Sequence, residues 1–228
     1  MRINHDRKAF SLLLLAVAIS LFSPYVFQYF LFKPAATLST IELLINIVVL
    51  IGIFIVEAIV TFRLTRKEAS RDFANSKLNG LTSAFLLVSF GVLPPVLDSY
   101  FFHWFTFNSF WLFFIGNALL ISGAIVRVVA IRELRGFFNH SLVLYDSHQV
   151  VSTGIYSKIR HPAYLGTLLM FVGFSLSYKS IASLFLVGFV LLYIFKRIRA
   201  EEAMLESRLF DTYRHYKQKT FCLIPFVI

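Results

Sequence analysis

Residues 107–131, with the sequence FNSFWLFFIGNALLISGAIVRVVAI, decide the architecture of this chain. The stretch holds a single charged residue, Arg127, close to its end. It is longer than the ~20 residues that an α-helix needs to cross the hydrocarbon core of a bilayer. A run of this length and composition predicts a membrane-spanning helix, because a helix satisfies its own backbone polar groups where no water can do so.

The composition of the whole chain points to the same solvent. Of its 228 residues, 58% are hydrophobic and only 15% are charged, and the mean hydropathy is +0.75. A soluble domain carries about a quarter charged residues, so these charges are too few to cover a water-exposed surface. The formal net charge of +10 does not indicate nucleic-acid binding, because the basic residues alternate with long apolar runs instead of forming one stripe.

Five further apolar segments flank this one. Residues 9–32, 38–62 and 80–102 precede it, and residues 163–178 and 181–195 follow it. The last two are shorter than a full span and are predicted to form a tight helical hairpin whose two ends return to the same face. The first resembles a signal peptide but lacks a small-residue cleavage site, so we interpret it as a retained helix. The sequence therefore predicts an all-α, polytopic membrane protein with about six membrane segments.

The basic residues indicate how these segments are oriented. All but two of the 22 Lys and Arg residues lie in the N-terminal tail, the loop after the second segment, the end of the fourth segment with the connector that follows it, and the C-terminal tail. The exceptions, Lys33 and Lys179, lie in the opposite loops. Basic loops favour the cytoplasmic side. We therefore expect an integral membrane protein with both termini and the long connector in the cytoplasm, where anionic headgroups add attraction.

Several polar residues fall within the predicted spans. Glu42, Glu57 and Asp98 lie near span ends, where burying a charge costs less than at the bilayer centre, and Asn46 follows Glu42 by one helical turn. This placement favours interfacial or helix-packing roles over a polar pathway. Pro94 and Pro95 predict a kink or a helix end.

The sequence contains no motif typical of a metal site or of a nucleotide-binding loop. The single cysteine, Cys222, excludes an internal disulfide and a cysteine cluster. His140, His148 and His161 have spacings that match no short zinc motif, and no cysteine is near them in the sequence. No G-x-G-x-x-G and no P-loop pattern is present. The sequence predicts neither a metal nor these nucleotide sites.

Residues 154–164, GIYSKIRHPAY, form a polar and aromatic connector between apolar runs, which lipid-facing packing does not require. Tyr156 and Tyr164 offer rings for stacking or for contact with a cation. Pro162 is suited to the first turn of a helix, which places His161 and the following backbone N–H groups at a positively biased helix end.

A second polar stretch, residues 197–202 (RIRAEE), follows the hairpin. A carboxylate of Glu201 or Glu202 can hold an amino or sulfonium group, and Arg197 or Arg199 can hold an anionic acceptor. Together the two stretches indicate a site for a cationic, aromatic cofactor at the water boundary.

The pattern Gly154-x-Tyr156-x-x-x-Arg160-His161-Pro162-x-Tyr164, followed by Arg197-Ile198-x-x-Glu201-Glu202, Phe210-x-x-Tyr213-x-x-Tyr216 and Pro225, resembles the isoprenylcysteine carboxyl methyltransferase (ICMT) family. That family consists of integral membrane enzymes that use S-adenosylmethionine (SAM). The resemblance covers roughly the last 90 residues. With the four apolar segments of residues 1–131, the sequence predicts a single membrane domain, in which residues 132–228 form the SAM-binding methyltransferase core that the resemblance implies.

The resemblance also implies roles for individual residues. An arginine that faces the acceptor carboxylate is Arg197 or Arg199. The residues implied to bind the cofactor are His148, Gln149, Val150, Val151, Tyr156, His161, Pro162, Ala163, Tyr164 and Glu202. Two features depart from the family: Asp211 stands where a glycine is common, and the connector before His148 is short.

The implied reaction suits the residues. A carboxylate acceptor is already ionised at neutral pH, so transfer of a methyl group needs positioning and desolvation more than a strong base. The expected substrate is a lipophilic or lipidated molecule that arrives from the bilayer, with membrane lipids as the other partner. Leu205, Leu209, Tyr213 and Tyr216 recur at helical spacing and predict a C-terminal amphipathic helix that serves as a lid or an anchor.

Three alternatives stay open. A related membrane methyltransferase could use an amine or thiol acceptor, such as a phospholipid headgroup, and would then need a base from His148, His161 or Glu201. A sterol-reductase-like membrane oxidoreductase has a loosely similar helical arrangement but needs a larger nicotinamide site. A membrane scaffold without catalytic activity is the fourth reading.

Overall fold

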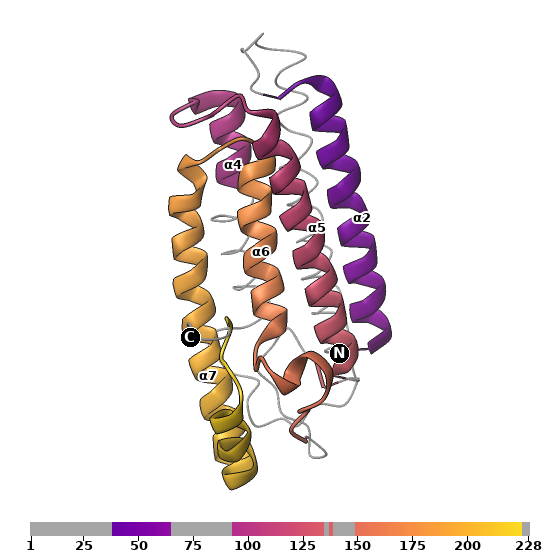
Figure 1. Ribbon diagram of the computed structural model, residues 1–228, viewed down its shortest axis with the longest axis vertical. Coiled ribbons are helices and arrows are strands. Elements are labelled where there is room, and N and C mark those ends of the chain that lie inside the picture. The colour runs from indigo at the N-terminus through magenta and orange to yellow at the C-terminus, as the bar shows by residue number, and fades with distance from the viewer. Residues whose placement is uncertain (1–37, 65–92, 135–136, 139–148, 225–228) are drawn as a thin grey trace, which may run out of the picture.

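The computed structural model describes residues 38–64, 93–134, 137–138 and 149–224. Four long helices dominate it: α2 (Thr40–Leu64), α5 (Phe110–Glu133), α6 (Pro162–Ser177) and α7 (Ala182–Lys219). Figure 1 shows α2, α5, α6 and the first part of α7 side by side along the long axis. Three short elements join them: α4 (Leu93–Leu97), the π-helical η3 (Asp98–Phe102) and the 3-10 turn η4 (Gly154–Ser157). The described part contains helices and no strand, which confirms the all-α prediction for it.

Two of the described helices are long and apolar enough to cross a membrane. They are Thr40–Glu57 within α2, with a mean hydropathy of 2.3, and α5, with 2.1. Helix α6 is apolar but has only 16 residues. The predicted segment 9–32 and most of 80–102 lie outside the described residues. The count of six spans and the cytoplasmic placement of the termini therefore stay predictions.

The predicted segments agree with the helices to within a few residues, except at the C-terminal side of the hairpin. The apolar run ends at Phe195, whereas α7 continues to Lys219. Residues 196–209 are rich in Arg, Ala, Glu, Met and Leu, which favour helix, and contain neither glycine nor proline. The helix therefore continues past the end of its apolar part.

Helices α5 and α6 approach each other through glycines. A Cβ atom added at Gly123 would lie 2.7 Å from the carbonyl oxygen of Gly166, and one at Gly166 would lie 2.6 Å from that of Gly123. Gly116, seven residues earlier on α5, and Gly173, seven residues later on α6, form the same kind of contact. Small residues at a helix interface let two backbones pack closely, which is how helices associate in a bilayer.

This contact predicts that Gly123→Ala destabilises the bundle. The new methyl group has no free space, and overpacking a tight interface costs about 1–3 kcal/mol. The matched control is Gly188→Ala on α7, because a Cβ there meets nothing within 4 Å. Thermal unfolding in detergent should show a lower midpoint for the first variant and an unchanged or higher one for the second. Equal midpoints for the two variants would contradict the packing.

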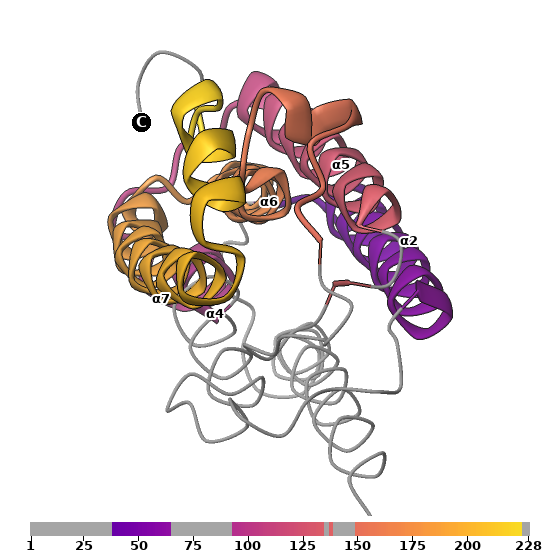
Figure 2. The same ribbon diagram turned by 90° about the horizontal axis from the view of Figure 1, so that it is seen from below.

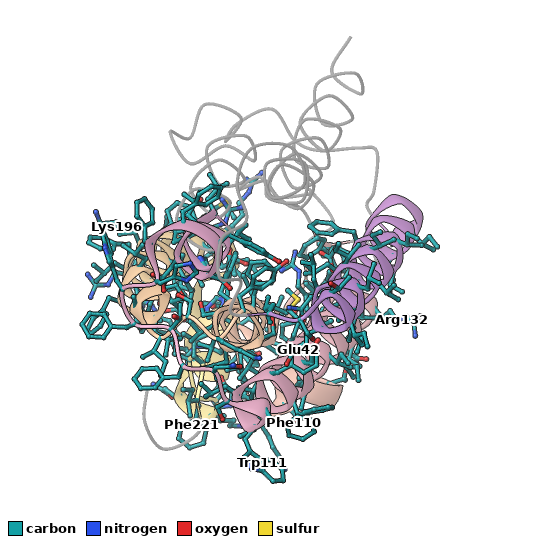
Figure 3. The ribbon with its side chains drawn as sticks, turned by 90° about the horizontal axis from the view of Figure 1, so that it is seen from above. Glu42, Phe110, Trp111, Arg132, Lys196 and Phe221 are labelled. Atoms are coloured by element: carbon teal, nitrogen blue, oxygen red, sulfur yellow. The ribbon has the colours of Figure 1, made fainter. Side chains whose placement is uncertain are left out.

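Polar contacts between helices fix the end of the bundle that carries the hairpin turn. The ammonium group of Lys179, at the turn between α6 and α7, lies 2.8 Å from Glu42 of α2. The hydroxyl group of Ser180 donates to Asp98. Figure 3, which views this end, shows Glu42 directed inward between helices while Phe110 and Trp111 point outward. These contacts of Glu42 and Asp98 agree with helix packing, one of the two roles predicted for them.

A second ion pair lies towards the other end of the same bundle. Arg127 of α5 contacts Glu57 of α2 at 2.7 Å and donates a hydrogen bond to the hydroxyl group of Thr167 of α6. Three helices are thereby joined close to the N-terminus of α6. The contact of Glu57 agrees with helix packing, one of the two roles predicted for it.

Candidate active site

The N-terminus of α6 carries the predicted cofactor residues. Pro162 is the first residue of the helix and His161 is its N-cap, as the sequence predicted. The preceding turn, η4, begins at Gly154 with a φ of 54°, a conformation that glycine adopts without steric cost. A Cβ atom there would also lie 2.9 Å from the carboxyl carbon of Glu133. The turn buries Tyr156 against the same end of the bundle.

Residues 220–223, which we call the C-terminal strap, run beside residues 158–161. The amide of Phe221 donates to the carbonyl of Lys158, and the amide of Arg160 donates to the carbonyl of Phe221. The amide of His161 donates to the carbonyl of Cys222. Leu223 is 1% exposed and packs with the α7 residues Val190, Ile194 and Ile198. The strap therefore fixes the backbone of His161 relative to α7 (Figure 1).

Glu202 of α7 joins this segment through a cluster of charges. Its carboxylate lies 3.2 Å from His161 Nε2, accepts a hydrogen bond of 2.9 Å from Arg160 and lies 2.7 Å from the ammonium group of Lys217. Burial alone would raise the pKa of Glu202, but hydrogen bonds from His161, Lys217 and Arg160 outweigh it and hold that pKa well below its usual range. Glu202 is therefore ionised, and its carboxylate oxygens are already bonded to Arg160, His161 and Lys217.

Glu201, one residue earlier, has different surroundings. The hydroxyl group of Tyr164 donates to its carboxylate at 2.8 Å, and the same hydroxyl accepts a hydrogen bond of 2.8 Å from Arg197 Nε. Arg197 is 5% exposed, whereas Arg199 is exposed. The sequence left open whether Arg197 or Arg199 faces the acceptor carboxylate. The geometry favours Arg197, because its side chain is buried beside Tyr164, whereas that of Arg199 is exposed.

The last part of α7 closes over this region. Phe210 has φ 41° and ψ −122°, which breaks the helix. Figure 2 shows the following residues lying across the lower end of the bundle. Tyr213 and Tyr216 are buried, and the Tyr216 hydroxyl donates to the carbonyl of Tyr156. Tyr213 and Tyr216, two of the four residues predicted to share one side of the C-terminal helix, therefore face the site.

The break lies next to Asp211, which stands where a glycine is common in the family. The left-handed backbone lies at Phe210 instead. A non-glycine residue at such angles costs about 1–3 kcal/mol, and the Phe210 side chain is 66% exposed, so little burial is lost with it. Phe210→Gly should therefore raise the unfolding midpoint. Asp211→Gly is the control and should lower it, because glycine within a helix costs about 1 kcal/mol. The opposite ranking of the two midpoints would refute this backbone geometry.

The predicted site residues fall into three groups: those that gather at the N-terminal end of α6, those of residues 149–151, and His148. Tyr156, His161, Pro162 and Ala163 are buried at the α6 end, and Tyr164, partly buried, joins them, as do Glu202 and Arg197 from α7. Val151 packs beside Tyr156 and Ala163, Val150 is partly buried, and Gln149 is exposed. His148 lies outside the described residues.

Sequence reasoning missed three contributors. The sequence marks Arg160 only as part of the motif and Lys217 only as one of the basic residues of the C-terminal tail, yet both bind Glu202. No cysteine lies near the histidines in the sequence, yet potential ligand atoms of Cys222, His161 and Glu202 all lie within 4.8 Å of one another. The positive charges of Arg160 and Lys217 on Glu202 make it unfavourable for a metal ion to bind between these three residues. That the site holds no metal stays a prediction. The signal for Arg160 in the sequence is its place in the family pattern, beside His161.

Comparisons with known proteins agree with these motifs. Residues 98–207 match the model of the isoprenylcysteine carboxyl methyltransferase (ICMT) family. A probable protein-S-isoprenylcysteine O-methyltransferase of Oryza sativa subsp. indica is 28% identical over 146 residues, which cover 62% of this chain and 75% of the rice protein. The protein-S-isoprenylcysteine O-methyltransferase of Saccharomyces cerevisiae is 35% identical over 116 residues, which cover 50% of this chain and 48% of the yeast protein.

A solved structure of the eukaryotic intramembrane Ras methyltransferase ICMT matches with a TM-score of 0.58 and 24% identity, over 95% of this chain and 74% of the other. At this identity the match shows the fold. The resemblance predicted from the motifs is confirmed by the match of residues 98–207 to the model of the ICMT family. The prediction that the chain is an enzyme, a methyltransferase, is confirmed by the match to this family and by the relatives named as methyltransferases.

Proposed function

We propose that this protein is a SAM-dependent carboxyl O-methyltransferase that acts at the membrane interface on an isoprenylcysteine-like or other lipophilic acid. The observation that carries the proposal is the contact of 3.2 Å between His161 and Glu202, which joins two stretches 41 residues apart in the chain. The family match over residues 98–207 supports the same reading.

The residues present fit the proposed cofactor. SAM combines an aromatic base, a sulfonium and an amino-acid end, and it supplies an electrophilic methyl group when bound. The N-terminus of α6 offers backbone N–H groups, and four tyrosines gather there: Tyr156, Tyr164, Tyr213 and Tyr216. Aromatic faces attract a sulfonium or ammonium charge. His148, Gln149, Val150, Val151, Pro162 and Ala163 complete the proposed binding set.

The two neighbouring carboxylates differ in how they are engaged. Glu202 is bound by three basic groups, which leaves it little capacity for a further cation. Within the described residues, Glu201 accepts its hydrogen bond from a neutral group, the phenol of Tyr164. We therefore assign the amino end of the cofactor to Glu201, and we assign to Glu202 the task of holding His161 and the C-terminal strap in place. This revises the role that the resemblance implied for Glu202.

Arg197 provides the proposed contact to the acceptor carboxylate. Its guanidinium is buried at the end of the apolar part of α7, where a lipophilic acid entering from the bilayer would arrive. A carboxylate attacks in its ionised form, so no protein base has to remove a proton. Holding it in line, in a site depleted of water, accounts for acceleration through positioning and electrostatics.

The alternatives make different demands. An amine acceptor needs a base, and Glu201 or His161 would have to serve as one. A membrane oxidoreductase is disfavoured, because the relatives that match the chain are named methyltransferases. A scaffold explains neither the buried charge cluster nor the family match.

The test is transfer of a labelled methyl group from SAM by the purified protein. The acceptor panel contains a prenylcysteine acid, its carboxamide, a phosphatidylethanolamine and a small thiol. The proposal predicts labelling of the acid, as a base-labile ester, and none of its carboxamide. Labelling of the phospholipid or the thiol in place of the acid would overturn the carboxyl assignment.

A further inference from the structure

The side chain of Arg197 is held from two sides. Its Nε donates to the hydroxyl of Tyr164 on α6 at 2.8 Å. Tyr193 lies four residues earlier on α7, which places its side chain beside Arg197 on the same face of the helix, and the two side chains are joined by a hydrogen bond. An arginine has four rotatable side-chain bonds, so a guanidinium must be fixed by neighbours if it is to present its planar fork in one orientation.

We propose that Tyr193 is a positioning residue for Arg197, and that the hydroxyl groups of Tyr193 and Tyr164 orient this guanidinium toward the acceptor carboxylate. The inference rests on the proposed function. Nothing in the sequence pattern of the two polar stretches pointed to Tyr193, because it lies within the apolar part of the hairpin.

Phenol groups are suited to this task. A carboxylate in the same place would fix the guanidinium but also neutralise its charge, and it would compete with an anionic acceptor. A phenol oxygen accepts the N–H bond and leaves the charge in place. Tyr164 is in addition polarised by its own bond to Glu201, which makes its oxygen a better acceptor for Arg197.

The position of Tyr193 also bears on access. It lies two residues before Phe195, where the apolar run of α7 ends, and its side chain is partly buried. Arg197 is 5% exposed and follows one turn later. The pair thus joins the apolar part of α7 to the proposed site of reaction, which is where the charged end of a lipophilic acid would be recognised.

The test compares Tyr193→Phe with wild-type protein. The substitution removes one hydroxyl group and keeps the ring, so packing is conserved. We expect the KM for a prenylcysteine acid to rise by about tenfold, equivalent to ~1.4 kcal/mol, which is the scale of one hydrogen bond to a charged group. The affinity for S-adenosylhomocysteine should stay within about twofold, because Tyr193 makes no proposed contact to the cofactor.

A second measurement separates orientation from a structural role. The prenylcysteine acid and its carboxamide serve as inhibitors of methylation of a different acceptor acid. Wild-type protein should bind the acid more tightly than the carboxamide, and Tyr193→Phe should reduce this preference. The matched control is Tyr178→Phe, at the opposite end of α6, which should change neither quantity.

Three results would each decide the matter. A Tyr193→Phe variant with the wild-type KM and the wild-type preference for the acid overturns the inference and leaves the proposed function intact. Parallel losses in thermal stability, cofactor affinity and turnover, with the preference unchanged, also overturn it, because they indicate a packing role. If wild-type protein methylates no carboxylic acid at all, the proposed function itself fails.

Discussion

Replacing Glu202 with alanine should destabilise the protein by about 3–5 kcal/mol and weaken the binding of S-adenosylhomocysteine with it. The carboxylate is the common partner of Arg160, His161 and Lys217, and it is 9% exposed. Removing one partner of a buried charge cluster leaves the others uncompensated, which is the costly case. The strap and the N-cap of α6 would then lose their link to α7.

Two variants separate this effect from direct cofactor binding. Glu206→Ala removes a partner of Lys217 that is more exposed, and it should cost less than about 1 kcal/mol. Glu201→Ala should weaken the affinity for S-adenosylhomocysteine while the unfolding midpoint falls less than in Glu202→Ala. Thermal unfolding and calorimetric titration measure the two quantities on the same samples. If Glu202→Ala keeps its stability and loses only affinity, Glu202 is the cofactor carboxylate after all.

Replacing Arg197 with alanine should lower kcat/KM for a carboxylic acid acceptor by about 10²–10³, the scale seen when a group that stabilises charge in a transition state is removed. The affinity for S-adenosylhomocysteine should change by no more than a few-fold. Arg199 is the matched control, because it lies two residues away and is exposed. Arg199→Ala should retain nearly full activity. A large loss in Arg199→Ala with normal turnover in Arg197→Ala would exchange the two roles.

The sequence was sufficient for the helices and for the two polar stretches. Apolar length predicted α2, α5 and α6 closely, because long apolar runs in a bilayer have few other stable conformations. Pro162 correctly predicted the start of α6, since proline at the first helical position loses no hydrogen bond. The family motifs then connected His161 with α7.

The contacts between the stretches could not be predicted in the same way. Glu201 and Glu202 are adjacent and chemically identical, and only the position of each on α7 decides that one meets Tyr164 and the other meets Arg160. The strap forms through backbone hydrogen bonds, which leave no pattern of side chains to read. The break at Phe210 occurs at a residue that ordinarily avoids such angles, so no local signal marks it.

The proposed function requires one site, formed by the α6 N-terminus, the C-terminal strap and α7 around a single cofactor molecule. An experimental structure of the protein with S-adenosylhomocysteine tests this most directly. We expect the ligand to lie between residues 161–164 and Glu201, with its sulfur on the side of Arg197. A ligand bound elsewhere on the chain, or contacts to neither His161 nor Glu201, would contradict it.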